Sequence, residues 1–140
     1  MKNWKLKKPS KWYRNWYRFI EFNANPLGRR VGDDAIRALA VAFDMTWYDV
    51  YDEFCAIGRK NAEFGYTTKC ISEFLKKRKT EEIEGDCHRW KTAKEFAAAH
   101  EKGSYVLLVG IDMSVMVDGC IYDTSDCTED FVSKAWRVLE

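Results

Sequence analysis

The first two-thirds of the chain carries apolar residues at intervals of three and four, which is the spacing of amphipathic helices. Between residues 33 and 100 the pattern predicts four helices, and cap residues mark where they begin. These starts are expected at Asp33 or Asp34, after Thr46, near Thr68 and after Thr92. The last helix has Glu95 in the position of a capping box and ends near His100. The charged residues 76–90 are expected to form an exposed connection.

The N-terminal 22 residues show a mixed pattern. Trp12 and Trp16 are four residues apart, and basic residues occupy the opposite side of the same segment. A short amphipathic helix is therefore expected, although residues 19–22 also fit a strand. Residues 23–33 contain proline and two glycines and are expected to form a loop.

The pattern changes after Gly103. Residues 104–117 are dominated by Val, Leu, Ile, Met and Tyr, which favours strands, and Asp118-Gly119 is a strong hairpin signal. A return strand is expected over residues 120–123, and residues 131–139 fit either a strand or a short helix. Helices followed by an antiparallel sheet predict an α+β fold.

Size and composition restrict the classes of protein that remain. The chain has 140 residues, 46% of them hydrophobic, which suits one globular domain. No apolar run approaches the length of a membrane-spanning helix, and the charged N-terminus lacks the apolar segment of a signal peptide. The five cysteines include no CxxC pair, so we expect free thiols and a cytoplasmic location. No membrane association and no cofactor are expected.

Charge is distributed unevenly along the chain. Residues 1–30 hold nine of the 23 basic residues but one of the 22 acidic residues. We interpret residues 1–18 as a basic, aromatic N-terminal extension and residues 19–140 as a single domain. The candidate binding residues in the extension are Lys5, Lys7, Lys8, Lys11, Trp12, Arg14 and Trp16.

Two interpretations of this extension stay open. Its lysines could hold phosphates while its rings stack on bases, which indicates nucleic-acid binding. Alternatively, the rings pack on the domain and the lysines are simply solvated. We expect packing for Trp16 and Phe19, whereas residues 1–8 are expected to remain free for a protein or nucleic acid.

Two segments carry a resemblance to a known family. They are NANPLGRRVGDDAIRALAVAF at residues 23–43 and KGSYVLLVGIDMSVMVDGCIYDTSDC at residues 102–127. TWYDVYDEF at 46–54 and TAKEFAAAHEKGSY at 92–105 fit the same pattern, whereas residues 76–89 match poorly. Together they resemble a family of small proteins with a papain-like cysteine-peptidase fold, found mostly in bacteriophages and prophages. The resemblance implies a papain-like form of the α+β fold.

The resemblance also indicates which positions would carry peptidase chemistry. The family usually reads G-D-C before its helix, with a histidine about six residues before the D-G turn and an aspartate in a later D-x-W-D. The matching positions are Asp34, Asp112 and Asp123, and Ser125 replaces the tryptophan. A carboxylate is a far poorer acyl-transfer nucleophile than a thiolate, and an ionised aspartate does not shuttle protons as imidazole does. The triad is therefore expected to be degenerate, with no catalytic residue.

Alternatives remain for these aspartates and for the cysteines. Asp34 could be an ordinary helix cap, since aspartate is among the best N-cap residues. If it faces Asp112, either one pKa rises or a cation lies between them, and a metal-assisted hydrolase built on the Asp cluster is the alternative function. Among the thiols, Cys87 beside His88 is the best remaining nucleophile, although neighbours in sequence point apart.

The sequence thus favours a non-catalytic protein of a phage or mobile element, located in the bacterial cytoplasm. It is expected to bind a host protein, and inhibition of a host defence complex, as by an anti-CRISPR protein, is one form of this function. No metal site is expected under this interpretation. Nucleic-acid binding through the N-terminal extension is a further alternative.

Overall fold

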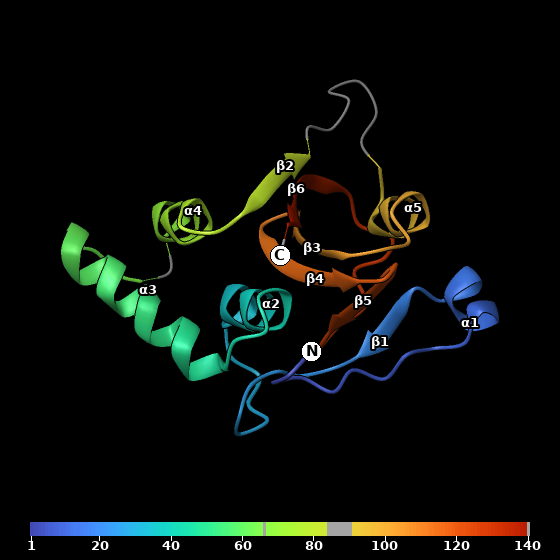
Figure 1. Cartoon of the computed structure of the whole chain (residues 1–140), viewed down its shortest axis with the longest axis horizontal. Coiled ribbons are helices and arrows are strands. Elements are labelled where there is room, and N and C mark those ends of the chain that lie inside the picture. Colours follow the sequence, from blue (N-terminus) through green and yellow to red (C-terminus); the bar gives the residue numbers. More distant parts are fainter. Residues whose placement is uncertain (66, 84–90, 140) are drawn as a thin grey trace.

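The computed structural model describes residues 1–65, 67–83 and 91–139. Helices and strands are mixed along this part of the chain (Figure 1). The helices are α1 (Lys11–Trp16), α2 (Asp34–Ala42), α3 (Trp47–Asn61), α4 (Thr68–Lys76) and α5 (Ala93–Ala99). The strands are β1 (Phe19–Glu21), β2 (Thr80–Ile83), β3 (Ser104–Val109), β4 (Asp112–Val117), β5 (Cys120–Asp123) and β6 (Val132–Val138). The α+β class expected from the sequence is confirmed.

One sheet with the strand order β1-β5-β4-β3-β6-β2 forms the centre of the molecule. Strands β2 to β6 pair antiparallel, whereas β1 pairs parallel with β5. The sheet is therefore mixed, and the expected purely antiparallel sheet is wrong. β1 has only three residues, which is too short for a pattern that would predict its partner. That partner, β5, lies about 100 residues further along the chain.

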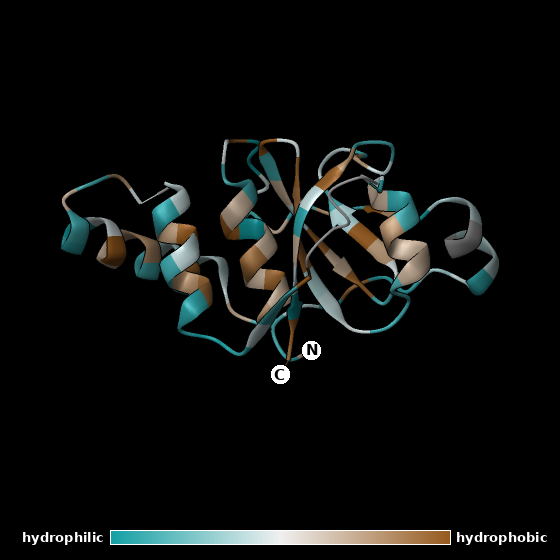
Figure 2. Ribbon diagram, turned by 90° about the horizontal axis from the view of Figure 1, so that it is seen from above, coloured by the Kyte–Doolittle hydropathy of each residue, from teal (hydrophilic) through white to brown (hydrophobic). Residues whose placement is uncertain are grey.

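Helices cover both faces of the sheet, and each face has its own core (Figure 2). On one face α2 packs against β4, and α3 and α4 pack further out; Ile36, Leu39, Phe54 and Phe74 are fully buried there. On the other face α5 packs its buried residues, Ala93 and Ala97 among them, against the sheet. None of the helices in the described ranges is long and apolar enough to cross a bilayer.

The local signals place most helix starts correctly. Thr46, Thr67 and Thr92 each cap a helix by accepting a hydrogen bond from the backbone N–H three residues on, and Glu95 completes the expected capping box. Asp33 occupies the N-cap position of α2, but its side chain makes no capping hydrogen bond. That carboxylate is used elsewhere, in the site described below.

Four expectations about local structure need correction or completion. Residues 80–83, expected in a connection, form β2. Backbone pairing with β6 makes them a strand, although their charged sequence does not indicate one. Residues 104–117 form two strands, since Gly110, at φ 62°, and the exposed Ile111 make a turn between them. Residues 131–139 contain a strand rather than a helix. Residues 11–21 contain both the short helix and the strand.

The N-terminal segment lies against the domain. The backbone N–H groups of Lys2 and Asn3 donate to Asp44, each at 2.8 Å, and the Trp4 indole N–H donates to the carbonyls of Ala40 and Met45. Desolvation opposes ionisation of Asp44, but the backbone N–H groups of Asn3 and Lys2 lower its pKa. The expectation that residues 1–8 stay free is wrong, because Trp4 caps the C-terminal end of α2.

Candidate functional site

Three structural elements meet at one end of the sheet. The first turn of α2, the start of β4 and the end of β5 lie together there, followed by the loop at residues 124–130. The chain termini lie toward the opposite end of the sheet, on the side where Figure 2 marks N and C. Lys2 contacts Asp44 just after α2, and β6 finishes beside the start of β3. The site therefore belongs to the back of the molecule as drawn in Figure 1.

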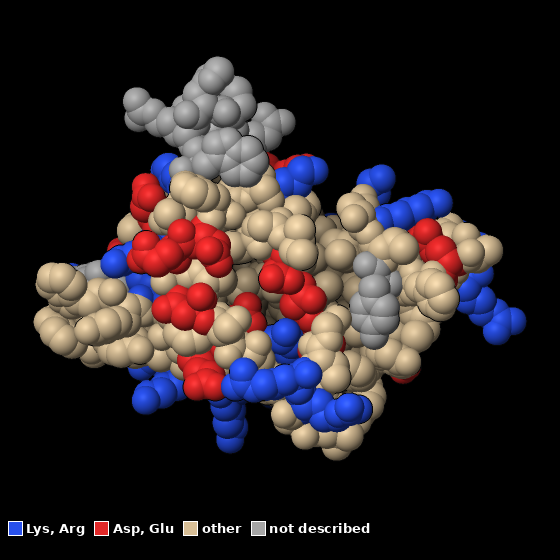
Figure 3. Space-filling view, turned by 180° about the vertical axis from the view of Figure 1, so that it is seen from behind, with Lys and Arg blue, Asp and Glu red and all other residues tan. Residues whose placement is uncertain are grey.

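A hollow of about 220 Å³ opens at this end of the sheet. Five aspartates and one arginine line it, together with smaller polar and apolar residues. The charged residues are Asp34, Arg37, Asp112, Asp123, Asp126 and Asp130. Figure 3 shows acidic side chains in several groups over this face, with basic side chains below them. The structure thus brings together all three residues that the resemblance singles out, Asp34, Asp112 and Asp123.

Asp34 joins the helix to the sheet. It is the first residue of α2, and its Oδ2 atom accepts a 2.7 Å hydrogen bond from the backbone N–H of Met113 in β4. This contact fixes position 34 next to Asp112, which directly precedes Met113. The sequence left open that Asp34 is the N-cap of this helix. This is wrong, because Asp33 occupies the N-cap position.

Arg37 organises the deeper part of the site. Its Nε atom donates to Asp33 at 2.8 Å and its Nη1 atom to Asp123 at 2.9 Å, with both carboxylates largely buried. Asp33 also accepts hydrogen bonds from Trp47 at 2.9 Å and Asn25 at 3.0 Å. Burial opposes ionisation of Asp33, but these donors together lower its pKa, and the two carboxylates raise the pKa of Arg37.

The surroundings of Asp112 shift its pKa in the opposite direction to that of Asp33. Its side chain is exposed at the start of β4, and both partial desolvation and the negative charges of Asp34 and Asp123 raise its pKa. Asp123 is held on its other side by the Ser114 hydroxyl, which donates to Oδ2 at 2.8 Å. Positions 34, 112 and 123 therefore share one electrostatic environment, in which Arg37 supplies the positive charge.

The hollow also contains a thiol that the sequence does not single out. Cys127 is half-buried beside Asp123, and burial together with that carboxylate raises its pKa to about 11. A reactive cysteine needs the opposite environment, in which a cation or a helix N-terminus lowers the thiol pKa. Cys127 is thus almost entirely protonated at neutral pH. The Cys87–His88 pair weighed earlier lies outside the described residues.

Sequence reasoning missed the residues that arrange this site. Arg37 lies four residues after Asp33, a spacing at which opposite charges meet on a helix, and this was the available signal. For Ser114 and Trp47 the sequence contains no comparable signal. Only the folded chain brings Ser114 to Asp123 and Trp47 to Asp33. Within the described ranges, no three His, Cys, Asp or Glu side chains lie close enough to hold a metal ion.

A larger groove adjoins the hollow. It encloses about 670 Å³ between α4 and the sheet, and Gly32 and Asp34 line both cavities. Its walls are mixed: Ile71 and Leu75 from α4 and Leu108 and Trp136 from the sheet are apolar, whereas charged residues line other parts of it, among them Lys76, Arg78, Glu82 and Lys134. Asp34 therefore lies where the acidic hollow meets the larger groove.

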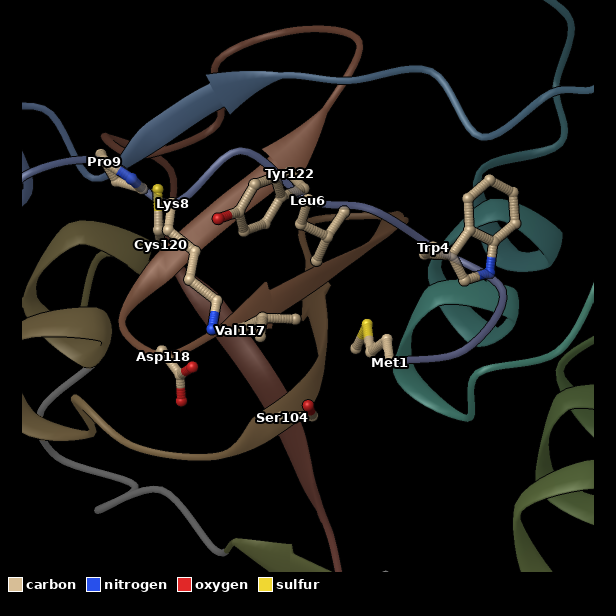
Figure 4. A pocket seen from close by; sticks show the side chains of 10 residues that line it. All are labelled: Met1, Trp4, Leu6, Lys8, Pro9, Ser104, Val117, Asp118, Cys120 and Tyr122. Carbon is tan, nitrogen blue, oxygen red and sulfur yellow. The ribbon is translucent and has the colours of Figure 1, made fainter.

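A third cavity lies at the other end of the sheet. It has about 340 Å³ and separates the N-terminal segment from the hairpin of β4 and β5. Figure 4 shows Leu6 beside Tyr122 there, and the Lys8 side chain extending toward Asp118. The Tyr122 hydroxyl donates to the backbone carbonyl of Lys7 at 2.7 Å, which ties the segment to β5.

The binding residues expected in the extension are not part of the acidic hollow. Lys5, Lys7 and Lys8 are exposed along the N-terminal segment, whereas Lys11, Arg14, Trp12 and Trp16 belong to α1. Trp16 is 61% exposed, so the expected packing of this ring is wrong; Phe19 is partly buried against the α5 side of the sheet.

Comparison with protein-family models, with curated proteins and with solved structures gives no match for this chain.

Proposed function

We propose that this protein is a catalytically inactive protein of the papain-like fold and that it acts by binding another protein. The observation that supports this most is the meeting of residues 34, 112 and 123 in one hollow. A Cys–His–Asp peptidase needs its nucleophile at a helix N-terminus facing a base on a neighbouring strand. Asp34 at the start of α2 and Asp112 at the start of β4, joined through the Asp34–Met113 hydrogen bond, support this proposal.

The chemistry at these positions supports a loss of peptidase activity. The Asp34 carboxylate accepts the Met113 N–H, and Asp123 is paired with Arg37. Because burial and neighbouring charge raise the pKa of Cys127 to about 11, this thiol does not replace the missing nucleophile. The site therefore lacks, among the described residues that line it, an activated nucleophile with a base.

Apolar side chains around the hollow support binding of a protein. Ile111, next to Asp112, is 96% exposed, Phe131, next to Asp130, is 56% exposed, and Val31 in the wall is 44% exposed. Exposed apolar residues that lie next to polar and charged ones are a feature of interaction surfaces. The five lining aspartates favour a partner that presents a basic group there.

The resemblance to phage proteins also indicates from which organism the partner would come. We infer a bacterial host protein, and the protein would then act in the cytoplasm of that host. Inhibition of a defence complex, in the manner of an anti-CRISPR protein, is the specific form that the small size of the chain favours.

Restoring the missing groups tests the papain-like geometry. Asp34→Cys places a thiol at the N-terminus of α2, and Asp112→His adds an imidazole beside it. We expect iodoacetamide at pH 7 to alkylate residue 34 of the double variant at least tenfold faster than in Asp34→Cys alone, since the imidazole favours the thiolate. Equal rates in the two variants would contradict the proposed geometry.

Binding is tested by a capture experiment with bacterial lysate. Ile111→Lys removes an exposed apolar contact and adds a charge that repels a basic partner, whereas Phe64→Lys is a matched control, because Phe64 is 88% exposed and lies beyond α3. A protein that is captured by the unchanged chain and by the control, but lost with Ile111→Lys, supports the proposal. Identical capture by all three forms would refute this surface.

A further inference from the structure

Three aromatic side chains on and directly after α1 remain exposed. Trp12, Trp16 and Tyr17 are 67%, 61% and 58% exposed. Trp12 and Trp16 lie four residues apart, so one face of the helix carries both indoles. Figures 1 and 2 place α1 at one end of the molecule, past β1 and far from α3 and α4. Rings this exposed bury little apolar surface against the fold, so most of their area is open to a partner.

Basic residues lead along the surface to these rings. Trp4 and Leu6 are partly buried while Lys5 and Lys7 are exposed, so the extended chain alternates and directs its lysines to solvent. Lys11 is exposed at the start of α1. Residues 1–18 contain five lysines, two arginines and no acidic residue. One of the two arginines, Arg18, is buried and pairs with Glu101.

The domain holds this basic segment in place. Trp4 donates to two carbonyls near the end of α2, and Tyr122 donates to the carbonyl of Lys7. A binding partner would therefore meet lysines whose backbone is already ordered, which lowers the conformational entropy lost on binding. The exposed rings lie next along the chain after this fixed segment.

We propose that residues 2–17 form a binding surface for single-stranded nucleic acid. The lysines would contact phosphates, and Trp12, Trp16 and Tyr17 would stack on unpaired bases. Unpaired bases fit better than a duplex, because exposed rings can stack on bases that are not already stacked within a helix. An acidic protein surface would use the lysines but would leave the exposed indoles without a function.

This surface is separate from the acidic hollow. The hollow lies where α2 begins, whereas the N-terminal segment crosses the end of α2 and the hairpin of β4 and β5. Loss of nucleic-acid binding and loss of the protein partner can therefore be observed independently, in different variants.

Fluorescence anisotropy with labelled dT12 and rU12 tests the proposal on the full chain. Contact of Lys5, Lys7 and Lys11 with phosphates gives a slope of about −2 for log K against log salt, so affinity should fall about 20-fold between 50 and 200 mM NaCl. Lys5→Gln with Lys7→Gln should make the slope shallower by about 1.4. Trp12→Ala with Trp16→Ala should weaken binding at least tenfold at either salt concentration, because stacking is lost.

Matched controls lie at the other end of the molecule. Lys76→Gln with Lys77→Gln removes the same charge from exposed positions around the end of α4, and Phe64→Ala with Tyr48→Ala removes two exposed rings near α3. Both controls should bind as the unchanged chain does. The proposal is overturned if neither oligonucleotide binds at 50 mM NaCl, if the controls lose as much affinity as the test variants, or if labelled poly-glutamate binds as tightly as dT12.

Discussion

The Oδ2 atom of Asp34 accepts a 2.7 Å hydrogen bond from the backbone N–H of Met113. The two residues are 79 positions apart in the sequence, yet this contact connects the first turn of α2 to β4. It also holds Asp34 close to Asp112, so the negative charge of Asp34 acts on Asp112. Together with the Arg37–Asp123 pair, this contact fixes the geometry of the hollow.

Asp34→Ala should destabilise the fold. The substitution leaves the Met113 N–H without its acceptor, and a hydrogen bond to a charged group contributes about 1.5–3 kcal/mol. Asp34→Asn keeps a carbonyl acceptor and should cost less than half as much. Urea denaturation followed by circular dichroism measures both. Equal stability of the alanine variant and the unchanged chain would show that water replaces the carboxylate at no cost.

Asp112→Asn should have the opposite effect. The pKa of Asp112 is raised by desolvation and by Asp34 and Asp123, so its ionised form destabilises the folded state at neutral pH. Removing the charge should stabilise the protein by no more than about 0.5 kcal/mol, because solvent screens an exposed side chain. The gain should vanish below about pH 4, where the unchanged carboxyl is protonated as well. A gain that persists at pH 3 would point to a cause other than charge.

Asp33 should contribute to acid sensitivity. Its pKa is lowered in the folded state, so its contribution to stability is complete above the unfolded value of 3.8 and is lost as the pH falls through the lower folded value. Asp33→Asn should cost about 3 kcal/mol at pH 7, since it leaves Arg37 with one carboxylate in a largely buried position. The difference between the two forms should shrink below about pH 4.

The exposed Asp52 provides a control for this experiment. Asp52→Asn should change stability by less than about 0.5 kcal/mol at every pH. If Asp33→Asn behaves in the same way, the buried network around Arg37 does not stabilise the fold.

The cysteines should differ in reactivity. Cys55 is exposed, whereas burial and Asp123 raise the pKa of Cys127 to about 11. With iodoacetamide at pH 7.5, Cys55 should be alkylated well before Cys127, as mass spectrometry of peptides can show. Between pH 8 and 9 the rate at Cys127 should rise about tenfold, because the thiolate fraction increases tenfold per unit below the pKa. A Cys127 that reacts as fast as Cys55 at pH 7.5 would be an activated thiol.

The two ends of the N-terminal region should respond differently to truncation of an indole. Trp4 packs against the core of α2 and donates to Ala40 and Met45, so Trp4→Ala should cost about 3 kcal/mol. Trp12 is exposed, and Trp12→Ala should leave the thermal midpoint nearly unchanged. A large loss in Trp12→Ala would mean that α1 packs on the domain in solution.

The sequence by itself determined the elements whose signals are local. Thr46 and Thr92 mark helix starts because a hydroxyl that caps a helix acts within three residues, and Asp118-Gly119 marks a hairpin because the turn needs a residue with positive φ. These signals do not depend on distant parts of the chain. They were sufficient for the α+β class and for most helix boundaries.

Tertiary structure decided the features that depend on distant partners. The parallel pairing of β1 with β5, the charged strand β2 and the docking of Trp4 on α2 each join residues far apart in sequence. The same holds for the site, where Arg37 pairs with Asp123 and Asp34 accepts a hydrogen bond from Met113. The motif resemblance did single out Asp34, Asp112 and Asp123, which share one hollow. Hydrogen bonds and charges act over a few ångströms in space, so the apolar and polar pattern alone does not show which of the 22 acidic residues share a cavity.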